Sequence, residues 1–121
     1  MVRLIIDGRL PGLNDYTLAN RTNRFAGAKM KKEQEEKIGA CIRSQLQNVH
    51  FDGAVAIDFY WYEPNKRRDI DNIAFAKKFI LDSLVRNEII ESDSWSGVVS
   101  FSDNFAIDKR KPRIEVFIRK V

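Results

Sequence analysis

Cysteine and histidine are almost absent from this chain. Its 121 residues include one of each, Cys41 and His50. A lone thiol excludes an internal disulfide, and the two residues together cannot supply the four ligands of a structural zinc site. A serine or cysteine triad would have to use His50, and no nucleophile motif surrounds it. An enzyme of this composition would therefore depend on carboxylates, lysine and a hard metal ion.

Long hydrophobic runs are also lacking. The apolar start ends at Asp7-Gly8, too early for the core of a signal peptide or for a membrane span. With the lone thiol, this favours a reduced cytoplasmic setting. The chain is 44% hydrophobic and 31% charged, which predicts one folded domain over residues 1–121. Its net charge of +4 is modest for a nucleic-acid binder, so the placement of the cations matters more.

The hydrophobic pattern predicts an α+β domain of order β-α-β-α-β-β. We expect two helices packed on a mixed sheet, and residues 13–28 irregular or only partly helical. The last two strands should form a hairpin around the basic turn 108–112. The expected strands are 2–6, 54–62, 98–107 and 113–121, and the expected helices are 29–46 and 71–86. The aromatic stretch 59–62 is expected to pack in the core.

The most informative segment is 66–72, where three cations run into Asp69 and Asp71. If this segment is extended, the two carboxylates point to the same side and can chelate a hard divalent cation. Acidic residues at a helix start are, however, more often caps that suit the helix dipole. On that ground alone, capping is the favoured interpretation of this pair.

Helical spacing adds weight to the metal-binding interpretation. Asp71, Lys78 and Asp82 would lie on one stripe of a continuous helix, opposite a core face. That core face comprises Ile73, Ala76, Ile80 and Leu84. Asp93 follows in a polar loop, where an ordinary turn residue is the simpler interpretation.

Basic residues form three groups. The simplest interpretation of each group is a solvated turn or helix face. Basic groups around an acidic site, however, favour contacts with DNA phosphates. The groups are Lys66-Arg67-Arg68, then Lys109-Arg110-Lys111 with Arg113, and finally Arg21, Arg24, Lys29, Lys31 and Lys32.

Three motifs resemble the RusA family of Holliday junction resolvases, which is often carried by phages and prophages. They are Arg68-Asp69-Ile70-Asp71-Asn72, Lys78 to Leu84, and Asp93; the opening Gly12-Leu13-Asn14 is also similar. Between Asn72 and Lys78 the interval is three residues longer than in some members, about one helical turn, so Lys78 should keep its face.

The resemblance implies a compact α/β homodimer that hydrolyses phosphodiesters at four-way DNA junctions with Mg²⁺, or Mn²⁺ as a substitute. It implies that Asp69, Asp71 and Asp93 are catalytic and bind the metal, and that Lys78 is the catalytic lysine. Arg68 would contact DNA, as we also expect of Lys66, Arg67 and Lys109-Arg110-Lys111. Asn72 and Asp82 would support the site. The alternatives are a related branch or flap nuclease, and a basic DNA-binding protein whose acids merely cap a helix.

Overall fold

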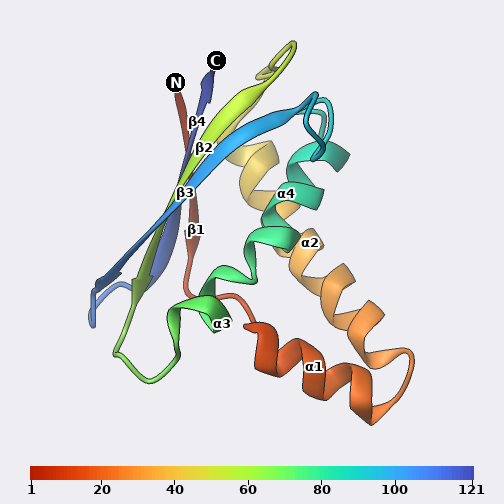
Figure 1. Ribbon diagram of the computed structural model, residues 1–121, viewed down its shortest axis with the longest axis vertical. Coiled ribbons are helices and arrows are strands. Elements are labelled where there is room, and N and C mark those ends of the chain that lie inside the picture. Colours follow the sequence, from red (N-terminus) through yellow and green to blue (C-terminus); the bar gives the residue numbers. More distant parts are fainter.

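A four-stranded mixed sheet carries four helices, all of them on one of its faces (Figure 1). The computed structural model describes all residues from 1 to 121. The strands are β1 (Val2–Asp7), β2 (Val55–Glu63), β3 (Val98–Ile107) and β4 (Arg113–Lys120). The helices are α1 (Leu13–Thr22), α2 (Ala26–Gln45), α3 (Ile70–Ala74) and α4 (Lys77–Arg86). The α+β class and the mixed sheet are confirmed, with four helices in place of the expected two.

The sheet order is β1-β4-β2-β3, which makes the hairpin prediction wrong. β4 pairs antiparallel with β1 and with β2, whereas β3 pairs parallel with β2. The basic turn 108–112 therefore carries the chain across β2 instead of joining adjacent strands. The sequences of β3 and β4 both alternate as those of a hairpin would. The pairing is decided instead by the position of β4 between two strands, where both edges of its backbone find hydrogen-bond partners.

Two helix predictions also need correction. Residues 13–28, expected to be irregular or only partly helical, are mostly helical and contain the whole of α1 and the start of α2. The single helix expected over 71–86 is two helices, separated at Phe75-Ala76. There the chain makes tighter bonds, from the Lys78 N–H to Phe75 O and from the Phe79 N–H to Ala76 O, which are the short i→i+3 type.

One hydrophobic core lies between the sheet and the helices. Its 20 residues include the expected face of Ile73, Ala76, Ile80 and Leu84, each at most 4% exposed. In the aromatic stretch, Phe59 and Trp61 are buried and stack on each other, confirming its core role, while Tyr60 is 36% exposed. Trp61 points into the core while its neighbour Tyr60 points away from it, because successive strand side chains point to opposite faces.

The helix layer covers β3, the edge strand, only in part. Val99, Phe101 and Ile107 remain 43–52% exposed, although Phe101 and Ile107 pair in register with Ile57 and Glu63 on the covered side of β2. An apolar strip therefore remains open along one edge of the sheet.

Candidate functional site

The turn between β2 and α3 presents two exposed carboxylates, Asp69 and Asp71, which we call the acid turn. Asp69 occupies the N-cap position of α3 in an extended conformation, yet its side chain makes no capping hydrogen bond. Neither carboxylate takes part in an ion pair within the chain. The capping interpretation favoured by the sequence therefore does not describe the Asp69 side chain. The expectation of an extended 69–71 segment holds only for Asp69, because α3 begins at Ile70.

Asn72 attaches the acid turn to the N-terminal loop. Its Oδ1 accepts a hydrogen bond of 2.9 Å from the Asn14 backbone N–H. A Cβ added at Gly12 would lie 2.5 Å from that same oxygen and 2.8 Å from the Asn72 carbonyl oxygen. Glycine is thus required at position 12 by the close approach of α3. The two separated motifs, Gly12-Leu13-Asn14 and Asn72, meet in space for this reason.

Lys78 and Asp93 form a second charged centre, with Asp82. The Lys78 Nζ lies 2.9 Å from Asp93 Oδ2 and 3.0 Å from Asp82 Oδ1. The hydrogen bonds to Asp93 and to Asp82 raise the pKa of the Lys78 ammonium, and Lys78 in turn lowers the pKa of the Asp93 carboxyl. Lys78 is therefore a fixed cation at neutral pH, and it is unsuited to act as a base.

A lysine from α2 completes this centre. Lys31 Nζ lies 3.1 Å from Asp82 Oδ2, an ion pair whose alignment is not that of a hydrogen bond. Asp82 is thus held between two lysines and is only 17% exposed. A cavity of about 430 Å³ opens beside Lys31, Lys78, Asp82 and Asp93. The sequence placed Lys31 among DNA-binding cations, and its pairing depends on the approach of α2 to α4.

The acid turn and Asp93 do not converge in the single chain. The carboxylate oxygens of Asp69, Asp71 and Asp93 are not all within 4.8 Å of one another, a separation that only His50, Asp52 and Glu91 satisfy. Because the helix breaks at Phe75-Ala76, Asp71 also does not share a continuous stripe with Lys78 and Asp82. The longer interval before Lys78 contains this break, so the argument that a full helical turn keeps Lys78 on the same face fails.

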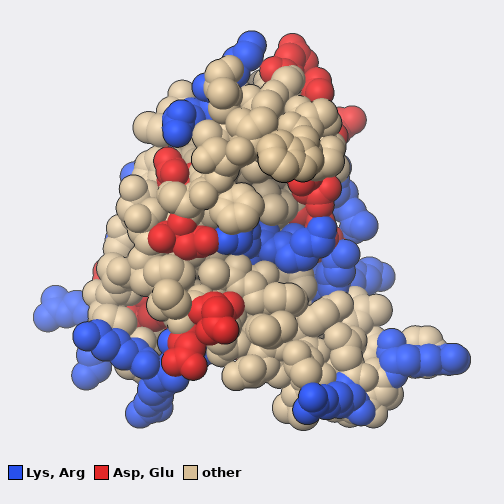
Figure 2. All heavy atoms as spheres, viewed as in Figure 1, with Lys and Arg blue, Asp and Glu red and all other residues tan.

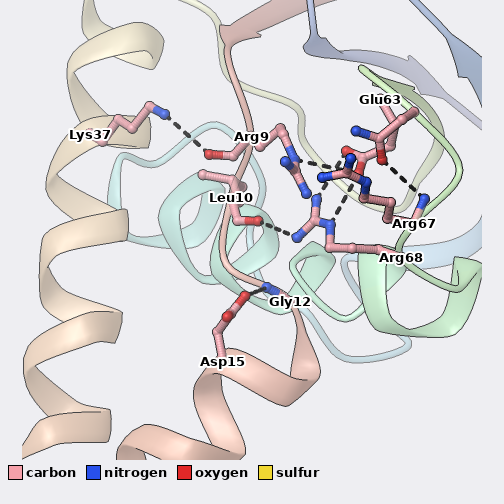
Figure 3. Close-up of polar contacts among 9 residues, drawn as sticks. Arg9, Leu10, Gly12, Asp15, Lys37, Glu63, Arg67 and Arg68 are labelled. Carbon is pink, nitrogen blue, oxygen red and sulfur yellow. Dashed lines mark hydrogen bonds and ion pairs between the residues drawn. The ribbon is translucent and has the colours of Figure 1, made fainter.

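Arg68 is engaged inside the protein (Figure 3). It donates two hydrogen bonds, of 3.0 and 2.9 Å, to the carboxylate of the buried Glu63, and a third, of 3.0 Å, to Leu10 O. Two parallel N–H···O⁻ bonds are the strongest geometry for an arginine–carboxylate pair. In this arrangement Arg68 fixes the chain that leads into the acid turn. Nothing in the sequence pointed to Glu63, because its pairing with Arg68 depends on where β2 ends in the folded chain.

Two of the three basic groups lie at the same end of the sheet. Lys66 and Arg67 are exposed beside the acid turn, and the Asp108 N–H bonds Glu63 O at 2.8 Å, which brings the exposed residues 109–111 to this end. Figure 2 shows blue side chains gathered there, at the lower left, with a red patch beside them. Arg113 lies on the face of the sheet opposite the core, paired with Asp108 and Glu115 and placed over the Tyr62 ring. The third group lies apart, on α1 and the start of α2 (Figure 1).

A further, partly buried pair lies next to Lys78 and was not foreseen. Lys77 pairs with Asp103 of β3, whose other oxygen accepts the Trp61 indole N–H at 2.9 Å. The Lys77 ammonium also lies 4.1 Å from the centre of the Phe101 ring. These contacts join the first turn of α4 to β2 and β3, so Lys78 projects from a held helix end. No helix of the structure has the length and apolar character needed to cross a membrane.

Comparison with known proteins agrees with these motifs. Residues 13–119 match the family model described as endodeoxyribonuclease RusA. No curated protein matches the chain. Since the matched segment contains the acid turn, Lys78, Asp93 and nearly the whole fold, the chain belongs to the RusA family of Holliday junction-resolving endonucleases.

Proposed function

We propose that this protein cuts four-way DNA junctions by Mg²⁺-dependent phosphodiester hydrolysis, with Mn²⁺ as a substitute, in DNA recombination and repair. The observation that carries the proposal is the uncommitted state of the acid turn: Asp69 occupies a cap position without capping, and neither Asp69 nor Asp71 has an ion-pair partner. Exposed ion pairs are weak, and Asp69 and Asp71 form none with the neighbouring cations Lys66 and Arg67. The carboxylates are therefore available for a metal cation, and Lys66 and Arg67 for phosphate.

The acid turn fits a hard divalent cation, because Mg²⁺ prefers oxygen ligands. Asp69 and Asp71 would hold it, and Asp93, which lies apart from them in the single chain, would have to be brought to them to serve as the third carboxylate. When bound, such an ion neutralises the non-bridging phosphoryl oxygens and lowers the pKa of a bound water. Asp93 would have to exchange its Lys78 partner for the metal, and Asp82 would keep Lys78 in place during that exchange.

Lys78 would stabilise the charge that develops on the phosphoryl group. Its pKa is raised, so it carries a full positive charge at the pH of the reaction. The release of Asp93 would leave one face of the ammonium free to meet a phosphoryl oxygen. A cation held beforehand by Asp82 needs little reorganisation in the transition state.

The remaining cations would bind the junction through its backbone. Lys66, Arg67 and the group 109–111 are exposed at one end of the sheet and can reach phosphates on either side of the acid turn. Arg68, predicted as a DNA contact, would have to act from its place against Glu63, and its main contribution would be to hold the segment 66–69. Junction recognition would then depend on DNA shape more than on base sequence.

A homodimer would match the two-fold symmetry of the junction. The open strip on β3 supports this proposal, because a ten-residue edge strand with exposed apolar side chains is prone to pair with another strand. Natural edges are usually protected by lysine, proline or exposed charge. β3 has one charged residue, Asp103, and its carboxylate is turned inward to Trp61 and Lys77.

The decisive experiment is cleavage of a labelled four-way junction by an Asp71→Asn variant in Mg²⁺. We expect cleavage to fall at least about a hundredfold, since a metal ligand is lost while the shape is kept, and junction binding to persist or strengthen. Glu36→Gln, at an exposed acid of α2 without an ion-pair partner, is the matched control and should cut normally. Cleavage by Asp71→Asn at the wild-type rate would contradict the acid turn as the metal site.

The same assay separates the alternatives. Flap and three-way substrates, cut faster than four-way junctions, would favour a related branch nuclease. Binding of all branched DNA without cleavage in either Mg²⁺ or Mn²⁺ would favour a non-catalytic DNA-binding protein.

A further inference from the structure

We propose that the cavity beneath the β1–α1 loop is a phosphate-binding site that holds a backbone phosphate of DNA next to the acid turn. The assignment of the phosphate to DNA rests on the proposed function, whereas the anion site itself does not. The cavity has a volume of about 530 Å³. It is lined by Arg9, Leu10, Pro11, Asp15, Gln34, Lys37 and Arg68.

The floor of this cavity has one more guanidinium than it has carboxylates. Glu63 is 8% exposed and uses both of its oxygens for Arg68, at 3.0 and 2.9 Å (Figure 3). Arg9 reaches the same carboxylate from β1's end, but only at 3.5 Å, and 39% of its side chain is exposed. One carboxylate cannot neutralise two guanidinium groups, so Arg9 remains the cation that is less tightly held and more accessible.

Lys37 supplies a third cation from α2. Its Nζ lies 3.5 Å from Arg9 O, where its ammonium reaches over the loop, and it has no carboxylate partner. Asp15 is the acid on the lining, and its Oδ2 accepts the Gly12 N–H at 2.9 Å. Three cations against Glu63 and Asp15 leave an excess positive charge of one, and Gln34 adds a neutral amide to the wall.

This chemistry suits a phosphodiester. A phosphate group in a backbone carries one negative charge, equal to the excess, and arginine presents paired N–H donors that match two phosphate oxygens. Lysine adds a flexible point charge. The wall favours an anion over a cation, because Arg9, Lys37 and Arg68 outnumber its single carboxylate, Asp15.

The position of the cavity links it to the acid turn. Arg68 lines this cavity and also the neighbouring one, of about 440 Å³, which Asp69 lines. An anion beside Arg9 would therefore lie on one side of Arg68, with the acid turn on the other. A DNA strand with one phosphate here would be held where another of its phosphates can reach Asp69.

The test uses Arg9→Gln and Lys37→Gln, with Lys120→Gln as the matched control. Lys120 is exposed, has no ion-pair partner and lies at the opposite end of the sheet (Figure 1). Inorganic phosphate, added against chloride at equal ionic strength, should shift the Arg9 Nε–H NMR signal saturably in the wild type and in Lys120→Gln, and not in Lys37→Gln. For junction DNA, the slope of log affinity against log salt should fall by about 0.9 in Arg9→Gln, in Lys37→Gln and in the double variant alike, because they lose the same phosphate.

Each outcome decides the proposal. An Arg9 signal that phosphate does not move overturns the anion site, even if the protein cuts junctions. A saturable phosphate response with a Lys37→Gln salt slope equal to that of Lys120→Gln overturns the assignment to DNA. Full responses to both phosphate and DNA, with no cleavage of any junction, support the phosphate site and contradict the nuclease proposal instead.

Discussion

At the scale of single residues, charge partners separate the side chains that hold the fold from those left for chemistry. Glu63 and Arg68 are mutually satisfied, as are Lys77 and Asp103, and both pairs are largely removed from solvent. Asp69 and Asp71 are exposed and unpaired. Lys78 is intermediate, since it is 57% exposed but held by two carboxylates.

Replacement of Lys78 by alanine should slow junction cleavage by roughly a hundredfold or more, the cost typical of losing one preorganised charge. The fold should persist, because the side chain is exposed and lies off the core face. Single-turnover cleavage and thermal unfolding measure the two effects. Lys120→Ala, at an exposed position at the end of β4 without an ion-pair partner, is the control. An unfolded Lys78→Ala protein would mean that the lysine is structural.

At the scale of elements, short connections determine where the functional groups point. The break at Phe75-Ala76 turns α4 so that Lys78 faces Asp93. The turn 108–112 is held by Asp108, whose Oδ1 accepts the N–H groups of Arg110 and Lys111 and whose Oδ2 binds Arg113. An acid therefore shapes the loop that presents the cations 109–111.

The Asp108 turn should make stability depend on pH in acid. The backbone bond from Lys111, the bond from Arg113 and the bond from Arg110 lower the pKa of the Asp108 carboxyl in the folded state. A lowered folded pKa means that the contribution is present above the unfolded value, about 3.9, and is lost as the pH falls through the folded value. The difference in unfolding free energy between wild type and Asp108→Asn should thus be constant at neutral pH and shrink below about pH 4.

Chemical denaturation of both proteins between neutral and strongly acidic pH measures that difference. Glu36→Gln, which removes an exposed acid of α2 without an ion-pair partner, is the control and should show no such trend. A difference between wild type and Asp108→Asn that grows as the pH falls would contradict the assigned contacts.

At the scale of the whole molecule, the uncovered strip on β3 is the feature that a single chain leaves unexplained. Four helices cover the face of β1, β4 and β2 but leave Val99, Phe101 and Ile107 partly open. Since large exposed apolar strips are unusual on monomers, they mark interaction surfaces. We propose a second copy of the chain as the partner, because a two-fold symmetric dimer would match the two-fold symmetry of a junction.

Val99→Lys should therefore weaken self-association at least about tenfold, because two like charges would meet across the symmetric edge. Sedimentation at several protein concentrations measures the dissociation constant. Leu18→Lys, at a 67% exposed apolar position on α1, is the control and should leave it unchanged. A wild-type protein that remains monomeric, or a Val99→Lys dimer as tight as the control, would contradict β3 as the interface.

The amino-acid sequence was sufficient for the features that depend on neighbours in the chain. Alternation and helical spacing identified all four strands and the core face of Ile73, Ala76, Ile80 and Leu84, and the motif residues carried the resemblance to the family. These follow from local periodicity and from residue types, which the linear order contains. The class of fold was predicted correctly on this basis.

The tertiary structure alone decided which distant groups meet. It put β4 between β1 and β2, and it paired Arg68 with Glu63 and Lys31 with Asp82. It also left the Asp69 side chain without a capping bond and divided the helix expected over 71–86 into two. Each of these depends on long-range packing and on competition among charges for partners. Several partners are compatible with any one charged residue along the chain, and only the folded arrangement of strands and helices selects among them.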